Sequence, residues 1–224
     1  VMLSKPSTCS DCVLYDSGKG FVPDETVENP EYVVLAEAPG STEVQEGKPL
    51  VGKAGFVLRS WIMRSVPAIQ VAYERKKVSL CNVLKCQPPE LNGRPYPTGE
   101  TRIKAEAHCR QYLNLGNPKT IILVGEVPQR SLFGPELERE DATDRSLGRS
   151  LKGVLGRVGR VYERDGTRYV FGPHPAFVLR QPMLVGHAVE AFKIAVSATY
   201  AEPQTVPWQE AVQELMMQKV EVIV

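Results

Sequence analysis

A short apolar run, Tyr32-Val33-Val34-Leu35, is followed by a stretch rich in glycine and proline from Ala36 to Gly55 and then by an apolar helical segment. The run predicts a buried strand, so that Glu37 stands at the carboxyl end of that strand. Open α/β sheets bind their ligands at this end. A glycine-rich loop that enters a helix also offers backbone N–H groups to an anion such as phosphate. The stretch therefore predicts a ligand-binding loop, although an ordinary connection uses the same residue types.

Five segments are typical of strands, and segments typical of helices alternate with them. The strand candidates are residues 31–37, 78–84, 119–125, 158–164 and 168–172, and the helix candidates are residues 54–66, 100–115, 126–133 and 186–200. Alternation of this kind predicts a mainly parallel sheet with helices on both faces. We expect an α/β fold, namely a three-layer αβα sandwich around a central, mainly parallel, four-stranded sheet.

The composition is that of a globular protein, with 42% apolar and 24% charged residues in a chain of 224 and a net charge of +1. It excludes collagen-like and disordered chains. No stretch approaches the ~20 consecutive apolar residues of a membrane span, and no secretory signal precedes the first strand. We expect a soluble, monomeric, cytoplasmic protein of a prokaryote or a virus, without a membrane partner. The net charge neither demands nor excludes nucleic acid.

The cysteine count argues against a disulfide framework, because it is odd and the chain lacks secretory signals. The five cysteines are Cys9, Cys12, Cys81, Cys86 and Cys109. Cys9 and Cys12 have the spacing of metal ligands. The same spacing occurs in redox motifs, but those begin a helix in a thioredoxin-like unit, whereas this pair lies in a polar segment before the first strand. The cysteines therefore indicate a metal or a metal cluster.

The carboxyl-terminal residues predict a separate unit. Residues 202–206 are typical of a linker, residues 207–218 of a short helix and Val220–Val224 of a strand. We expect one domain over residues 1–200, and residues 201–224 to lead into a further domain of a longer polypeptide. A natural edge strand at the end of the chain is the alternative.

Four segments, in this order, resemble motifs of the uracil-DNA glycosylase superfamily, most closely its iron-sulfur family 4. The loop over residues 36–55 is similar to GEAPG…GxPFVGxAG, and Cys81–Pro89 (CNVLKCQPP) is similar to TNVVKCRPP. Gly125–Gly134 occupies the place of the turn after the third core strand, and Gly172–Pro182 (GPHPAFVLRQP) is similar to THPAxLLR. The resemblance implies hydrolysis of the N-glycosidic bond of uracil in DNA, which leaves an abasic site for base excision repair.

The resemblance also implies a 4Fe-4S cluster. Its ligands in this chain would be Cys9, Cys12, Cys86 and Cys109. Four thiolates equally satisfy a structural zinc ion, so the residue types alone leave the metal open. Cys81 stands where the family usually has threonine, and we expect it to be a buried strand residue.

The same motifs imply the residues that act on the base. Asn82 would accept from uracil N3–H and donate to O4, which excludes cytosine. His174, held between two prolines, would donate to O2 as negative charge develops. Glu37 would orient the water or offset the positive charge of the sugar. Ala38 and Leu50 would line the uracil pocket.

The DNA should be held by the turn before the first long helix and by the segment after His174. The residues expected at the DNA are Gly52, Lys53, Gly55, Phe177, Leu179 and Arg180. We expect the segment after His174 to be a loop, from which Leu179 or, as second choice, Phe177 enters the duplex where the base has left. In the alternative, both side chains pack beneath this segment.

Two positions depart from the family pattern. Leu50 replaces a phenylalanine that resembles a stacking platform, and base-aromatic stacking contributes on the order of 1–3 kcal/mol. Val44 replaces an aspartate. These departures leave open an alternative hypothesis, a DNA-binding module with weak or no catalysis inside a larger replication or repair polypeptide. A small-molecule enzyme that contains a cluster or a zinc ion is the third hypothesis. It is disfavoured because Asn82 and His174 match the family motifs in the same order along the chain.

Overall fold

The computed structural model describes residues 3–90, 99–134, 137 and 156–197. Its centre is a five-stranded sheet with the strand order β2-β1-β3-β5-β4. The strands are β1 (Tyr32–Ala36), β2 (Val78–Asn82), β3 (Thr120–Val124), β4 (Val161–Arg164) and β5 (Thr167–Gly172). The first four strands in the spatial order are parallel, and β4 is antiparallel to β5. The expected mainly parallel sheet is confirmed, with one strand more than the four expected.

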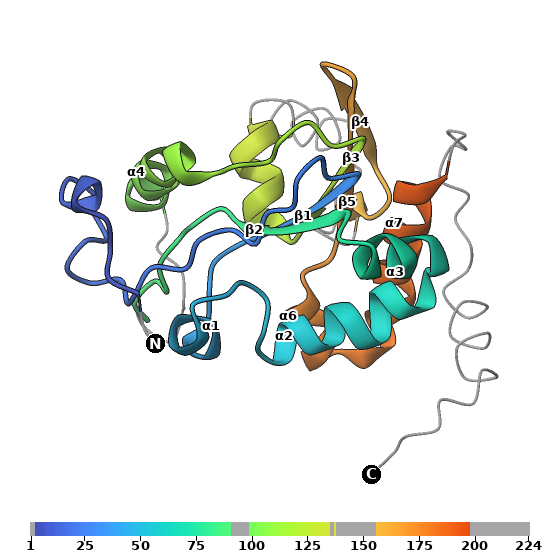
Figure 1. Ribbon diagram of the computed structural model, residues 1–224, viewed down its shortest axis with the longest axis horizontal. Helices are drawn as coiled ribbons and strands as arrows, with labels where there is room; N and C mark the ends of the chain where they lie inside the picture. Colours follow the sequence, from blue (N-terminus) through green and yellow to red (C-terminus); the bar gives the residue numbers. More distant parts are fainter. Residues whose placement is uncertain (1–2, 91–98, 135–136, 138–155, 198–224) are drawn as a thin grey trace, which may run out of the picture.

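The helices cover both faces of the sheet and one of its ends (Figure 1). They are α1 (Ser41–Glu46), α2 (Lys53–Val57), α3 (Pro67–Glu74), α4 (Gly99–Cys109), α6 (Pro175–Arg180) and α7 (Val185–Val196). Short turns of 3-10 or π helix are η1 (Ser7–Cys9), η2 (Leu58–Ile62), η3 (Met63–Ser65), η4 (Arg110–Tyr112) and η6 (Pro182–Leu184). A further helical segment covers residues 126–134. Among the helices described, none combines the length and the apolar character needed to cross a bilayer.

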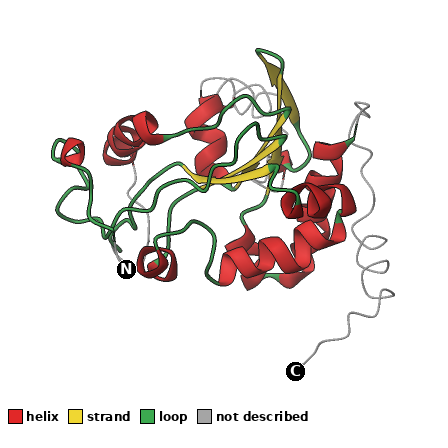
Figure 2. Ribbon diagram, in the orientation of Figure 1, coloured by secondary structure: helices red, strands yellow, loops and turns green. Residues whose placement is uncertain are grey.

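Each central strand is buried on both faces, as parallel strands between two helical layers must be. In β1, Val34 packs in a core with residues of η2, α3 and α7, whereas its neighbour Val33 packs in a second core with Phe133 of the segment 126–134. Ile122 and Ile121 of β3 divide between the two cores in the same way. Figure 2 shows the resulting helix-sheet-helix arrangement. The expected three-layer αβα sandwich is confirmed.

The strands agree with the sequence prediction to within three residues at each end, but four helical segments do not. The helix expected over residues 54–66 is interrupted by the π turn η2, and α1 and α3 were not expected. The segment after His174, expected as a loop, is the helix α6, which begins at Pro175 because proline is favoured in a first helical turn. The linker, helix and strand expected over residues 202–224 lie outside the described residues.

The amino-terminal segment runs along the outer edge of β2 (Figure 1). Glu25 pairs with Leu80 in an antiparallel bridge, and Lys19 pairs with Gln87 beyond the end of the strand. An edge strand exposes backbone groups that must find partners. The polar amino-terminal segment therefore covers this edge.

The loop between β1 and α2 folds back tightly on itself. Leu50 has a left-handed backbone, with φ at 54°. A β-carbon added at Gly55 would lie 1.6 Å from the carbonyl oxygen of Leu50. Only glycine fits at position 55, because any side chain there would push the loop away from α2.

We expect Gly55→Ala to lower the free energy of unfolding by about 3 kcal/mol, at the upper end of the usual cost of overpacking. Urea unfolding followed by circular dichroism measures the change. Gly134→Ala is the matched control, since a β-carbon there meets nothing within 4 Å. Equal midpoints for the two variants would contradict the tight turn.

Candidate functional site

The candidate site lies at the carboxyl edge of the sheet, where neighbouring strands end side by side. Glu37 follows β1, Asn82 ends β2 and His174 lies two residues beyond β5. The register places Ala36 opposite Asn82 and Val124 opposite Gly172, so the strand ends are level. The structure therefore brings the three expected residues to one edge, from three strands that are distant in the sequence.

Asn82 presents an unsatisfied acceptor. The residue is 1% exposed, and its side-chain oxygen Oδ1 is buried with no hydrogen-bond partner among the described residues. Leaving a buried acceptor without a partner costs about 1–3 kcal/mol. Such a group is expected where a ligand supplies the missing N–H donor.

His174 is held as a neutral imidazole with one defined tautomer. The backbone N–H of Ala176 donates to its Nδ1 over 3.1 Å, so the proton of the neutral ring is on Nε2. Burial, together with the charge of Arg180, lowers the pKa of His174 to about 4. A β-carbon at Gly125 would lie 3.0 Å from the β-carbon of His174, so glycine makes room for this side chain. His174 can therefore donate through Nε2 at neutral pH.

Glu37 carries a strongly perturbed carboxyl group. Burial is the main cause that raises the pKa of Glu37 to about 7, and the Glu106 carboxylate raises it further. The guanidinium groups of Arg102 and Arg180 act in the opposite direction. Glu106 and Arg102 belong to α4 and form an ion pair of 3.3 Å. Helix α4 thus sets part of the electrostatics at Glu37, a contribution that sequence analysis missed.

Glu43 closes the loop between β1 and α2. Its Oε2 accepts from the N–H of Gly40 over 3.1 Å, and its Oε1 accepts from the N–H of Gly52 over 2.8 Å. The carboxylate is buried against both glycines, where a β-carbon would come within about 3 Å of it. Glu43 therefore joins the two ends of the loop, and the Gly52 amide, expected at the DNA, has a protein partner here.

Two residues expected in the uracil pocket are packed inside the protein. Leu50 belongs to the core that contains Val57 and Val178, and Arg59 donates to its carbonyl oxygen over 2.6 Å. Ala38 packs against the cluster around Leu84. The contact of Leu50 and Ala38 with uracil stays a prediction.

The residues expected at the DNA lie on two adjacent helices, α2 and α6 (Figure 1). Lys53 and Arg180 are exposed, Leu179 is 36% exposed and Phe177 is partly buried. Phe56 of α2 is a further exposed aromatic side chain. These helices thus place apolar and basic side chains on the surface next to His174, the amino-terminal cap of α6.

The four cysteines expected as ligands line one cavity. The cavity is lined by Cys9, Cys12, Cys86 and Cys109, together with Lys5, Leu14, Tyr15, Phe21 and Lys85. Burial raises the pKa of the Cys86 thiol to about 11 and that of Cys109 to about 12. These thiols are protonated at neutral pH, so a bound metal would have to displace their protons. The donor set, four sulfurs around one apolar cavity, fits a cysteine-ligated cluster.

The cysteine sulfurs do not have the arrangement of ligands around a single metal ion. In the part of the chain that the structure describes, no group of three or more His, Cys, Asp or Glu side chains is arranged to hold one metal ion. Cys81 lies apart from the cavity, fully buried in the second core, with its thiol 3.8 Å from the carbonyl oxygen of Asn114. Its expected burial is confirmed.

A cavity of about 490 Å³ lies at the opposite edge of the sheet. Its lining includes Glu31, Lys77 and Lys119, which directly precede β1, β2 and β3. It is therefore at the amino ends of the strands, away from Glu37 and His174. Strand ends and buried polar groups, rather than the size of this cavity, locate the candidate site.

The chain belongs to a known family of proteins. The model of the uracil DNA glycosylase superfamily matches residues 23–197, and the chain belongs to this superfamily. Similar proteins include the type-4 uracil-DNA glycosylase of Pyrobaculum aerophilum, 30% identical over 80% of this chain and 83% of that protein. The type-4 uracil-DNA glycosylase of Archaeoglobus fulgidus is 31% identical, over 79% of this chain and 81% of its own length.

We expect Glu43→Gln to lower the free energy of unfolding by about 1–3 kcal/mol, because an amide can accept only one of the two loop N–H bonds and turns a donor toward the other. The urea midpoint measures this change. Glu46→Gln, on the exposed face of the same helix, is the control and should leave the midpoint unchanged. A Glu43→Gln midpoint equal to that of the control would rule out the loop closure.

Proposed function

We propose that this protein removes uracil from DNA by hydrolysing the N-glycosidic bond, which leaves an abasic site. Membership of the superfamily and the type-4 relatives support this function. The observation that carries it is the buried Asn82 Oδ1 without a partner in the described part of the chain, at the edge that also carries His174 and Glu37.

Recognition of the base rests on two neutral side chains. Asn82 would accept from N3–H through Oδ1 and donate to O4, an arrangement that cytosine cannot match because its N3 is an acceptor. His174 would donate from Nε2 to O2, where negative charge develops as the base departs. A neutral donor that is already oriented stabilises this charge without reorganisation during the reaction.

Glu37 would complete the reaction. As the bond between C1′ and N1 breaks, its electron pair stays on uracil and the sugar becomes positively charged. The ionised Glu37 would stabilise that charge and accept a proton from the water that adds to C1′. The uracil anion then takes a proton from solvent. A carboxyl group with a pKa of about 7 is ionised in about half of the molecules at neutral pH.

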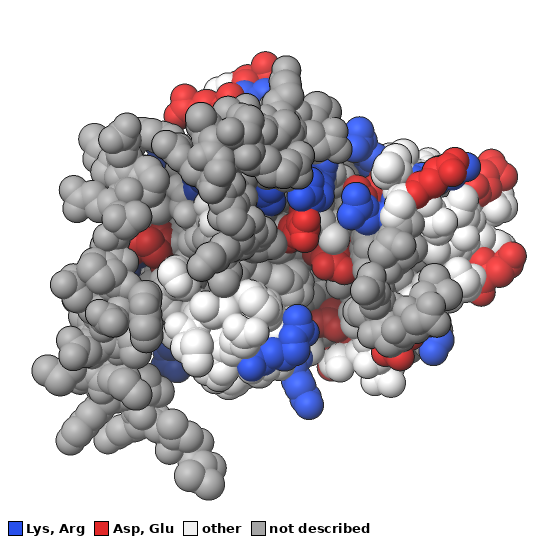
Figure 3. Space-filling model, turned by 180° about the vertical axis from the view of Figure 1, so that it is seen from behind, with Lys and Arg blue, Asp and Glu red and all other residues white. Residues whose placement is uncertain are grey.

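The DNA would contact a small part of the protein surface. Lys and Arg side chains lie among Asp and Glu side chains on the face shown in Figure 3. The exposed residues of α2 and α6, in particular Lys53, Leu179 and Arg180, would meet the phosphates and the gap left by the flipped base. Insertion of Leu179 offsets the few kcal/mol lost on unstacking.

Cys9, Cys12, Cys86 and Cys109 would hold a 4Fe-4S cluster. When bound, the cluster supplies four iron-sulfur bonds that fix the amino-terminal segment to α4 and to the segment after β2. The cysteines come from these separate segments, and they share one cavity. Their proposed role is structural, because none of the steps above requires electron transfer.

The activity test uses a labelled uracil-containing oligonucleotide, followed by alkali to cleave abasic sites. We expect cleavage by the wild-type protein and a loss of at least about 100-fold in the single-turnover rate for His174→Ala and for Glu37→Ala. His187→Ala is the matched control, since His187 lies in α7. If the wild-type protein cleaved no more than the two variants, the proposed enzymatic activity would be refuted. DNA binding by the wild-type protein in that case would favour a binding module.

The single-turnover rate should rise with pH and level off above an apparent pKa of about 7, because only the ionised Glu37 is active. His174 stays neutral throughout this range, since its pKa is near 4. A pH series from 5.5 to 8.5, on the wild type and on Glu37→Gln, measures the profile. A wild-type rate that is flat across pH 7, or the same ascending limb in Glu37→Gln, would contradict this role.

Anaerobically purified protein should show a broad absorbance near about 400 nm, typical of a 4Fe-4S cluster. Iron analysis should find four iron atoms per chain, and Cys109→Ser should lose the absorbance, whereas Cys81→Ser should keep it. A colourless protein with one zinc ion per chain would reject the cluster in favour of structural zinc.

A further inference from the structure

A charged pair is buried beside the candidate site. The side chain of Asp24, in the amino-terminal segment, is 4% exposed, and that of Lys85, shortly after β2, is 2% exposed. The ammonium group of Lys85 donates to Oδ1 of Asp24. Burying such a pair is costly, and an apolar pair of similar volume often stabilises a protein equally well. The pair therefore calls for a reason beyond stability.

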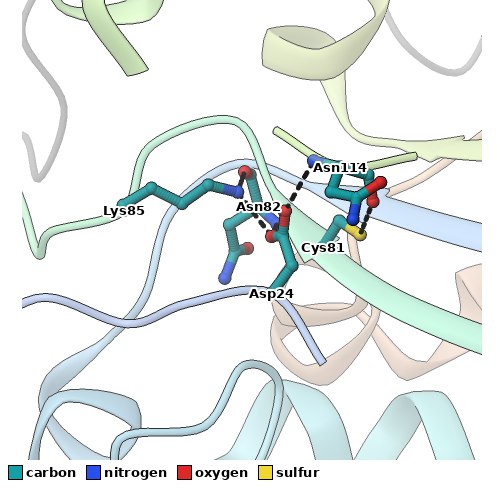
Figure 4. Close-up of polar contacts among 5 residues, drawn as sticks. All are labelled: Asp24, Cys81, Asn82, Lys85 and Asn114. Carbon is teal, nitrogen blue, oxygen red and sulfur yellow. Dashed lines mark hydrogen bonds and ion pairs between the residues drawn. The ribbon is translucent and has the colours of Figure 1, made fainter. Parts of the chain in front are cut away.

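Both members of the pair hold the backbone of Asn82 (Figure 4). The N–H of Asn82 donates to Oδ1 of Asp24 over 3.2 Å, and Nζ of Lys85 donates to the carbonyl oxygen of Asn82 over 2.6 Å. The second carboxylate oxygen of Asp24 accepts from the N–H of Asn114 over 3.3 Å. The peptide groups on both sides of the Asn82 α-carbon are thus fixed.

The position of Asn82 explains why side chains are needed there. β2 is the outer strand of the sheet, paired on its inner side with β1. On its outer side, Leu80 exchanges two backbone hydrogen bonds with Glu25, each of 2.9 Å. Two residues further on, no strand among the described residues pairs with this outer side of Asn82, and Asp24 and Lys85 supply the acceptor and the donor instead. A carboxylate and an ammonium group have opposite hydrogen-bonding character, so together they satisfy both backbone groups at once.

We propose that Asp24 and Lys85 are positioning residues that fix the backbone of Asn82 so that its side chain meets the pyrimidine edge of uracil. This inference rests on the proposed function. Neither residue touches the base, and both act through Asn82. Because the Asn82 side chain is itself without a partner at Oδ1 among the described residues, its backbone is what sets its orientation.

Lys85 also extends this network to the cysteines. It lines the cavity of the four cysteines, and its backbone acts to lower the pKa of the Cys109 thiol, against the larger effect of burial. One residue thus contacts both the cysteine cavity and the residue that would recognise uracil.

The test is a double-mutant cycle that separates positioning from folding. The double variant Asp24→Asn/Lys85→Met removes both charges, so it avoids a buried charge without its partner, and thermal unfolding by circular dichroism checks its fold. Glu100→Gln breaks the exposed pair with Lys104 on α4 and is the matched control. Single-turnover rates on uracil-containing DNA are measured in the wild-type, Asn82→Ala and His174→Ala backgrounds.

We expect the double variant to lose about tenfold or more in rate in the wild-type and His174→Ala backgrounds, as for one lost hydrogen bond to the base. In the Asn82→Ala background it should lose less than about twofold, because there is no side chain left to position. Glu100→Gln should change no rate. If the double variant lowered the single-turnover rate by the same factor in all three backgrounds, the proposal would be overturned, because a general loss of structure acts equally in each.

Hydrogen-deuterium exchange provides a measurement that does not depend on catalysis. The double variant should exchange faster than the wild type at residues 80–85, and Glu100→Gln should not. Unchanged exchange there would also overturn the proposal. A wild-type protein without activity on uracil-containing DNA would count against the proposed function alone, and the exchange result would still decide whether Asp24 and Lys85 hold Asn82.

Discussion

The rest of the molecule depends on the parallel pairing of four strands whose carboxyl ends are aligned with one another. Ala36 lies opposite Asn82, and Val124 lies opposite Gly172. A shift of one residue in either pairing would turn the affected side chains to the opposite face of the sheet. The register therefore decides that Glu37, Asn82 and His174 emerge at one edge, although more than 130 positions separate the first from the last.

At that edge, burial controls the chemistry. The same removal from water that raises the pKa of Glu37 lowers the pKa of His174, so one carboxyl group titrates near neutrality while one imidazole stays uncharged. Among the described residues none donates to the side-chain oxygen of Asn82, whereas its backbone groups bond to Asp24 and Lys85. The edge is thus arranged in advance for a ligand that donates one hydrogen bond and accepts others.

Apolar runs and the alternation of strand and helix segments were enough to predict the strands, the layers and the place of Glu37 at the end of the first strand. Asn82 and His174 were expected only from the resemblance to the superfamily motifs. The Glu43 closure was not predicted, because its two partners are backbone amides brought together only by the fold. Asp24 was missed for the same reason: it is 58 positions from Asn82 and lies in a segment without periodicity. The helix α6 was taken for a loop because six residues between two prolines show too little of a helical repeat.

A crystal structure of the protein with bound uracil would show whether the base lies at the carboxyl edge of the sheet. We expect electron density for the base with N3 at hydrogen-bonding distance from Asn82 Oδ1 and O2 at that distance from His174 Nε2. Uracil bound instead in the cavity lined by Glu31, Lys77 and Lys119, at the amino ends of the strands, would contradict this expectation.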